Sequence, residues 1–172
     1  MARRSRSKTN PTAWWSALRR SWARWTGSLR RAELLSRMEP ADIVLASPRL
    51  RRLSPIALAH RLLLGSRYVH SMLYVGDDRM IHTTSRHGVV VGRVPKKVFD
   101  RQRYAVYRVP GLSAAQRARI VEHATEQLDR RIDHVAMASN IPGRWLGLPR
   151  PLVRAREGRL WCSRLIAEAY HV

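Results

Sequence analysis

The chain of 172 residues contains one cysteine, Cys162, at the start of its last apolar stretch. This stretch reads as a helix, on which Cys162 would share a face with Leu165, Ile166 and Ala169. In the first turn of a helix, unpaired backbone N–H groups and the positive end of the helix dipole stabilise a thiolate. Cys162 could therefore be a nucleophile, a redox-sensitive thiol, or the first residue of a buried apolar stripe.

A thiol nucleophile needs an imidazole as general base and a third group that orients the imidazole. His70 and His82 lie in two segments, 69–75 and 80–84, that read as an antiparallel hairpin around Gly76-Asp77-Asp78. If these three residues form the turn, His82 falls on the same face as His70, whereas a two-residue turn would place it on the opposite face. Each histidine alone also fits a half-buried strand residue bonded to backbone or water.

Metal chemistry has little support in the sequence. A single cysteine can form neither an internal disulfide nor a zinc site made of cysteines. His82 and His87 are conceivable metal ligands, but no third ligand lies at a sequence spacing typical of a metal site. We therefore predict no metal and no cofactor.

The elements that must position these residues are mixed helices and strands. Further strands are expected at 41–45, 89–91 and 104–109, and helices at 56–64, from Ser113 to about 128, and at 161–170. Residues 140–159 are rich in Pro, Gly and Arg and read as a long loop. The expected fold class is α+β, with an antiparallel sheet packed against helices and the cysteine at the start of the C-terminal helix.

Residues 1–39 are expected to form a separate basic region before a domain at 40–172. Residues 1–10 read as a disordered arm, and an amphipathic helix is expected after Thr12. Its tryptophans and arginines could lie in a membrane interface or bind a polyanion, but the helix could equally pack on the protein or on a partner chain. The candidate binding residues are Trp14, Trp15, Trp22, Trp25, Arg19, Arg20 and Arg24.

The formal net charge is +21, and its excess of arginine predicts an anionic partner. Residues 1–40 carry ten basic and two acidic side chains, and residues 41–172 carry 23 basic and ten acidic ones. Charge alone does not choose among nucleic acid, an anionic membrane and a cell-wall polymer. Since no apolar run of about 18 residues and no secretory signal is present, a cytoplasmic or peripheral membrane location is expected, with packaging in a virion as a further possibility.

The order of the segments resembles that of the circularly permuted papain-like hydrolases of the NlpC-type superfamily, typified by the YiiX and YaeF group. The segments are Asp42-Ile43-Val44-Leu45, then Tyr68 to Asp77, then Met80-Ile81-His82, then Trp161 to Tyr170. The resemblance implies a papain-like core in which Cys162 is the nucleophile, His70 the base and His82 the third polar residue. The histidine segment is also similar to that of the lecithin:retinol acyltransferase group.

The chemistry implied by the resemblance is acyl transfer through a covalent acyl-enzyme on Cys162. The leading hypothesis is an amidase or peptidase, with cell-wall peptides as one candidate substrate. A lipid acyl hydrolase or acyltransferase at a membrane surface is a second hypothesis, and a non-enzymatic binding or assembly protein on an inactive hydrolase fold is a third. The backbone N–H of Cys162 is the natural first oxyanion donor. Candidate substrate contacts are Tyr74, Ser163 and Asp42.

Overall fold

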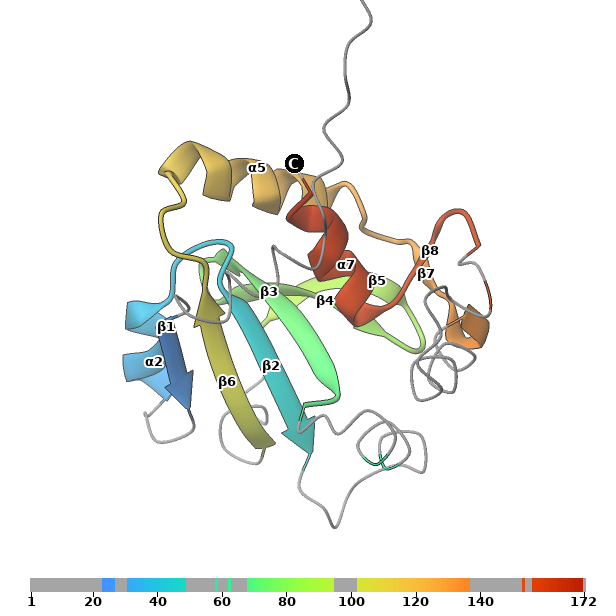
Figure 1. Ribbon diagram of the computed structural model, residues 1–172, viewed down its shortest axis with the longest axis horizontal. Helices are drawn as coiled ribbons and strands as arrows, with labels where there is room; N and C mark the ends of the chain where they lie inside the picture. Colours follow the sequence, from blue (N-terminus) through green and yellow to red (C-terminus); the bar gives the residue numbers. More distant parts are fainter. Residues whose placement is uncertain are drawn as a thin grey trace, which may run out of the picture.

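The structure, a computed structural model, describes residues 23–26, 31–48, 58, 62, 68–94, 102–136, 153 and 156–171. Its centre is an antiparallel six-stranded sheet with the strand order β1-β6-β2-β3-β4-β5 (Figure 1). The strands are β1 (Ala23–Thr26), β2 (Ile43–Pro48), β3 (His70–Gly76), β4 (Arg79–Thr84), β5 (Gly88–Arg93) and β6 (Gln102–Arg108). The helices are α2 (Arg31–Arg37), α5 (Ala114–Thr125) and α7 (Cys162–Ala169). The prediction of an α+β fold with an antiparallel sheet packed against helices is confirmed.

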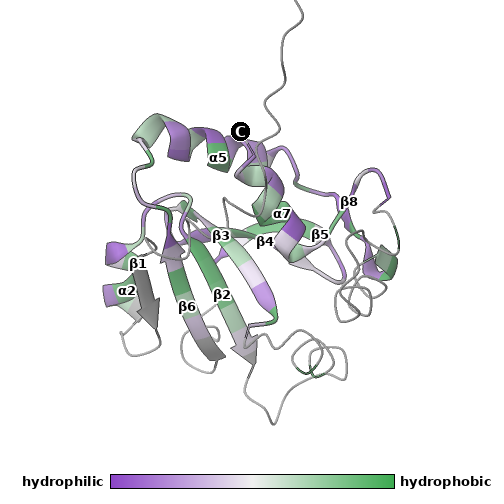
Figure 2. Ribbon diagram, viewed as in Figure 1, coloured by the Kyte–Doolittle hydropathy of each residue, from purple (hydrophilic) through white to green (hydrophobic). Residues whose placement is uncertain are grey.

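The sheet is covered on both faces, because successive side chains of a strand point to opposite sides. Met72 and Met80 belong to one buried cluster with Leu34 and Met38, so this face is covered by α2 and the residues just after it. The opposite face packs against α5 and α7, and its cluster comprises Ala41, Ile43, Leu73, Ile81, Val89, Ile120, Ala124, Leu160, Leu165, Ile166 and Ala169. Figure 2 shows apolar residues along β2 and β6 between these layers.

The hairpin of β3 and β4 has the expected register, which it reaches through a two-residue turn. Met72 pairs with His82, as predicted. The turn itself contains only Asp77 and Asp78, whose φ angles of 50° and 57° are left-handed, as in a type I′ hairpin turn. Of the two turn lengths considered, the two-residue turn is therefore the one that forms. An irregularity between Tyr74 and Gly76 inserts one extra residue into β3, and this bulge restores the face that a two-residue turn alone would have reversed.

Most other elements lie near their predicted positions. The predicted strands at 41–45, 89–91 and 104–109 correspond to β2, β5 and β6, and the predicted C-terminal helix to α7. Ser113 begins α5 through a capping box, since its Oγ accepts from Gln116 N at 3.2 Å and its N donates to Gln116 Oε1 at 2.9 Å. Leu58 and Leu62 are helical, in keeping with the helix predicted at 56–64, whose other residues lie outside the described part of the chain.

The predicted tryptophan-rich helix is wrong where the structure describes it. Residues 23–26, which include Arg24 and Trp25, form the edge strand β1 and pair with β6. A spacing of three and four residues between apolar side chains defines one face only if the backbone is helical. In this segment the backbone instead forms hydrogen bonds with the open edge of β6. The short helix α2, which follows β1, was not predicted.

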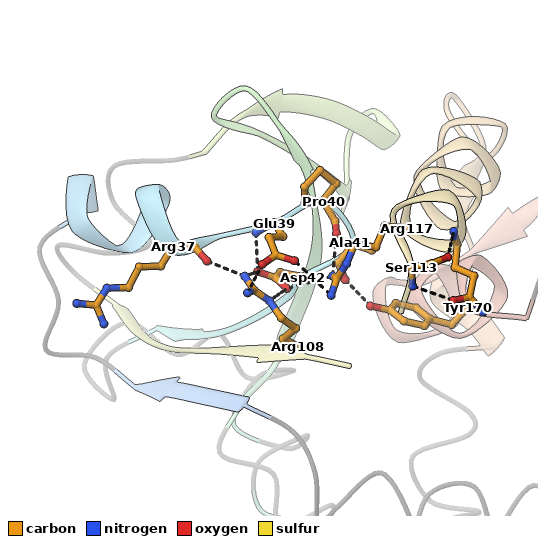
Figure 3. A network of polar contacts seen from close by, with 10 residues as sticks. Arg37, Glu39, Pro40, Ala41, Asp42, Arg108, Ser113, Arg117 and Tyr170 are labelled. Atoms are coloured by element: carbon orange, nitrogen blue, oxygen red, sulfur yellow. Dashed lines mark hydrogen bonds and ion pairs between the residues drawn. The ribbon is translucent and has the colours of Figure 1, made fainter. Parts of the chain in front are cut away.

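A buried ion pair joins the start of β2 to the end of β6 (Figure 3). Asp42 is fully buried, and its two carboxylate oxygens accept from Arg108 Nε at 2.9 Å and Arg108 Nη2 at 2.7 Å. Arg108 also donates to Glu39 Oε1 at 2.5 Å and to the carbonyl of Arg37 at 2.6 Å. Arg117 of α5 lies 3.3 Å from the Glu39 carboxylate. The network therefore connects the end of α2, two central strands and α5.

Asp42→Ala is expected to lower the free energy of unfolding by about 3–5 kcal/mol, because it leaves the Arg108 guanidinium half-buried without its main partner. Urea unfolding followed by circular dichroism would measure the change. Glu33→Ala is the control, since it removes an exposed ion pair with Arg37 and should cost about 0.5 kcal/mol or less. A decrease in the free energy of unfolding of less than about 1 kcal/mol for Asp42→Ala would contradict the conclusion that this network holds the elements together.

Candidate functional site

The structure brings two of the predicted catalytic residues together. His70 begins β3, His82 lies in β4, and the Met72–His82 register places both side chains on one face of the sheet. His70 Nε2 lies 3.4 Å from His82 Nδ1, with the ring centroids 5.5 Å apart and the ring planes at 80°. Because this contact uses Nε2 of His70, Nδ1 is the ring nitrogen that could exchange a proton with a third group.

The surroundings of the two rings favour the neutral imidazole. Burial lowers the pKa of His70 below its ordinary value of 6.5. Burial also lowers the pKa of His82, and repulsion from His70 lowers it further, whereas a contact with the Thr83 backbone acts in the opposite direction. A neutral imidazole can accept a proton at pH 7, so His70 has the protonation state that a general base requires.

Cys162 is the first residue of α7 and is half-buried. The N-cap residue, Trp161, makes no side-chain cap, so no side chain at that position competes for the N–H groups of the first turn. Leu165, Ile166 and Ala169 are buried against the sheet, and helical spacing places Cys162 on the same stripe. The thiol therefore lies on the sheet side of α7, at the end where the helix dipole favours a negative charge.

A small parallel sheet holds the segment that leads into Cys162. β7 (Arg131–Ile132) pairs with β8 (Arg159–Leu160), and Asp133 N donates to the carbonyl of Leu160 at 3.2 Å. The buried Asp133 carboxylate accepts from Ala136 N at 3.0 Å and from Arg156 N at 2.8 Å. These bonds fix the chain on both sides of β8, immediately before the nucleophile candidate.

The contacts at the far end of α7 indicate which part of β3 its first turn should face. At the far end of the helix, the Tyr170 hydroxyl donates to the carbonyl of Ala41, whose own N–H donates to Tyr74 at 2.8 Å. An eight-residue helix rises about 12 Å, and three residues of strand span about 10 Å. From Tyr74, this distance leads back to Ser71 and His70, and Figure 1 shows α7 running in the same sense as β3.

Cys162 and the histidine pair are nevertheless on different sides of the sheet. His70 and His82 alternate with Leu73 and Ile81, which face α7, so the two rings leave the sheet on the α2 side. Among the described residues, the thiol makes no hydrogen bond with either histidine. Cys162 and His70 thus belong to opposite faces of the sheet, and no contact joins the two side chains in the described part of the chain.

Two predicted substrate contacts are corrected by their burial. Asp42 is fully buried and bonded to Arg108, and Tyr74 is 6% exposed within the cluster under α2. Neither side chain is accessible to a substrate, because the alternation of β2 and β3 turns both inward. Ser163, next to the nucleophile candidate, is exposed. Ser71 was not predicted as a site residue, although its place beside His70 could have drawn attention to it.

The predicted anion-binding residues fall largely outside the described part of the chain. Trp14, Trp15, Trp22, Arg19 and Arg20 lie there, and Arg24 and Trp25 belong to β1. The described residues include 15 Lys or Arg and 11 Asp or Glu, so they carry only +4 of the net +21. Most of the excess charge therefore belongs to segments that the structure does not describe.

The described ranges contain no group of three or more His, Cys, Asp or Glu side chains that could hold a metal ion. Within the same ranges, no helix combines the length and apolar character that a membrane crossing needs.

Comparison with models of protein families and with curated proteins found no match for this chain. The site must therefore be judged on its own geometry.

The histidine pair should make stability depend on pH. Because the pKa of each ring is lowered in the folded protein, the unfolded chain binds protons more readily near pH 6. The contribution of the two neutral rings to the free energy of unfolding is complete above pH 6.5, and it should be lost as the pH falls below that value. Urea unfolding at several pH values should show a smaller loss for the His70→Gln/His82→Gln variant than for the unmodified protein. His87→Gln, at an exposed position, is the matched control. If the free energy of unfolding of the double variant fell with pH as steeply as that of the unmodified protein, the prediction would be contradicted.

Proposed function

We propose that this protein is a cysteine hydrolase with a permuted papain-like fold, acting on amide or ester bonds through an acyl-enzyme on Cys162. The observation that carries the proposal is the contact of His70 Nε2 with His82 Nδ1, taken together with the place of Cys162 at the start of α7. A base, an orienting group and a nucleophile at a helix start are the three parts that thiol catalysis needs.

The proposed reaction begins with transfer of the thiol proton to His70 Nδ1, while His82 holds the other side of the ring. The thiolate attacks the carbonyl carbon, a C–S bond forms, and the carbonyl electron pair moves to oxygen. The Cys162 N–H donates to this oxyanion. When the intermediate collapses, the leaving amine or alcohol takes the proton from His70, and water then hydrolyses the acyl-enzyme.

This mechanism places a clear demand on the structure. The Cys162 thiol and His70 Nδ1 must approach within hydrogen-bond distance around the start of β3, because α7 packs on the other face of the sheet. His70 is held by its pairing with Ala46 of β2, whereas Cys162 is the first residue of its helix. The mechanism therefore requires the first turn of α7 to approach His70 around the start of β3.

Alkylation of Cys162 by iodoacetamide tests the proposed pair. The unmodified protein should react faster at pH 6.5 than the same protein in guanidinium chloride, and His70→Ala should slow the reaction about tenfold or more, because the imidazole no longer stabilises the thiolate. His82→Ala should have a smaller effect in the same direction, and His87→Ala should have none. An alkylation rate typical of an ordinary thiol, and unchanged in His70→Ala, would contradict the proposal.

A second candidate function is binding to an anionic membrane surface, either alone or together with lipid acyl chemistry. It is favoured by the distribution of charge, since +17 of the net +21 belongs to residues outside the described part. Arginines near an anionic surface each contribute about 1 kcal/mol to binding. This function and the cysteine chemistry are compatible, because they use different residues.

Arg19→Ala/Arg20→Ala in the full chain should weaken binding to vesicles containing phosphatidylserine by roughly 30-fold, as expected for two lost arginines. Cosedimentation at low ionic strength would measure the change. Arg86→Ala/Arg93→Ala, at exposed positions of the β4–β5 hairpin, removes the same charge and is the matched control. Equal losses in both variants would show that net charge alone, and not the N-terminal region, drives binding.

A further inference from the structure

Ser71 is a buried hydroxyl without a hydrogen-bond partner. It follows His70 in β3, is 6% exposed, and its Oγ is among the buried polar atoms that no group in the structure satisfies. Such an atom costs stability, and most buried hydroxyls avoid this cost by pairing. Among the described residues, the O–H of Ser71 is therefore available as a donor to a group that comes within reach.

The side chain of Ser71 belongs to the α7 side of the sheet. Ser71 pairs with Leu45 of β2, which packs against the cluster that contains Leu165 and Ile166 of α7. The next residue on the same face of β3 is Leu73, a fully buried member of that cluster. The hydroxyl thus points toward the layer that contains α7, whereas His70 points away from it.

The length of α7 relates its first turn to Ser71. The helix runs in the same sense as β3, its C-terminal end is held at Ala41 beside Tyr74, and its length matches the distance back to Ser71. Helical spacing places Cys162 on the sheet-facing stripe of that turn. The unpaired hydroxyl and the half-buried thiol therefore belong to the same interface, and in this structure Ser71 Oγ makes no hydrogen bond to the sulfur.

We propose that the Ser71 hydroxyl donates a hydrogen bond to the Cys162 sulfur once the thiol has lost its proton. This rests on the proposed function. The proton passes to His70, the sulfur keeps the electron pair, and no covalent bond forms or breaks at Ser71. A neutral thiol is a weak acceptor, whereas a thiolate is a strong one, so the hydroxyl is unpaired in the resting state and paired in the reactive state.

The test is the pH profile of iodoacetamide alkylation for Ser71→Ala in the full chain. Loss of a hydrogen bond to a charged sulfur should raise the pH of half-maximal rate by about one unit, and should slow the reaction about tenfold below that pH. The urea midpoint should stay the same or rise, because an unsatisfied buried hydroxyl has been removed. Ser71→Thr keeps the hydroxyl and should retain a profile close to that of the unmodified protein.

Ser47→Ala is the matched control, since Ser47 is a fully buried serine in the neighbouring strand β2. It should leave the alkylation profile unmoved. A purely structural role for Ser71 would change the urea midpoint and leave the profile of folded Ser71→Ala as it was, and that result would overturn the inference. His70→Ala separates the two proposals: if it slows alkylation while Ser71→Ala does not, the proposed function stands and this inference fails. If neither variant changes the profile, both fail.

Discussion

The register between β3 and β4 determines which layer of the protein each side chain of the hairpin enters. Both faces of the sheet are covered, so a shift by one residue would exchange the contents of two buried clusters. The bulge between Tyr74 and Gly76, combined with the tight turn at Asp77 and Asp78, sets this register. The contact between His70 and His82 is a direct result, because only this pairing places both rings on one side.

The buried pair of Asp42 and Arg108 fixes the other end of the same strands. It ties β2 to β6 at the point where the chain enters the sheet, and it lies beside Ala41, the acceptor of the Tyr170 hydroxyl. Since Tyr170 closes α7, the position of the helix along β3 depends on this corner. A charged network far from Cys162 thus helps to set the level at which the thiol meets the sheet.

The proposed proton transfer would use three different local environments. The histidine pair is buried enough to favour the neutral form, the first turn of α7 favours a negative charge, and Ser71 presents a buried donor on the α7 side of the sheet. Side-chain alternation puts the imidazoles and the helix on opposite faces, so the proposed chemistry requires the ends of β3 and α7 to meet. The strong positive charge of the chain plays little part here, because most of it lies in segments outside the described residues.

Local signals in the sequence determined the strands β2 to β6, α5 with its Ser113 cap, and α7, because each depends on periodicity or capping within a short segment. The shared face of His70 and His82 depended on the bulge in β3, which no local signal predicted. Tertiary structure decided the remainder. Residues 23–26 joined an open sheet edge in place of the expected helix, and Asp42 and Tyr74 were turned into the interior. The orphan hydroxyl of Ser71 and the side of the sheet chosen by α7 arise from contacts between distant segments, and no spacing within one segment encodes such contacts.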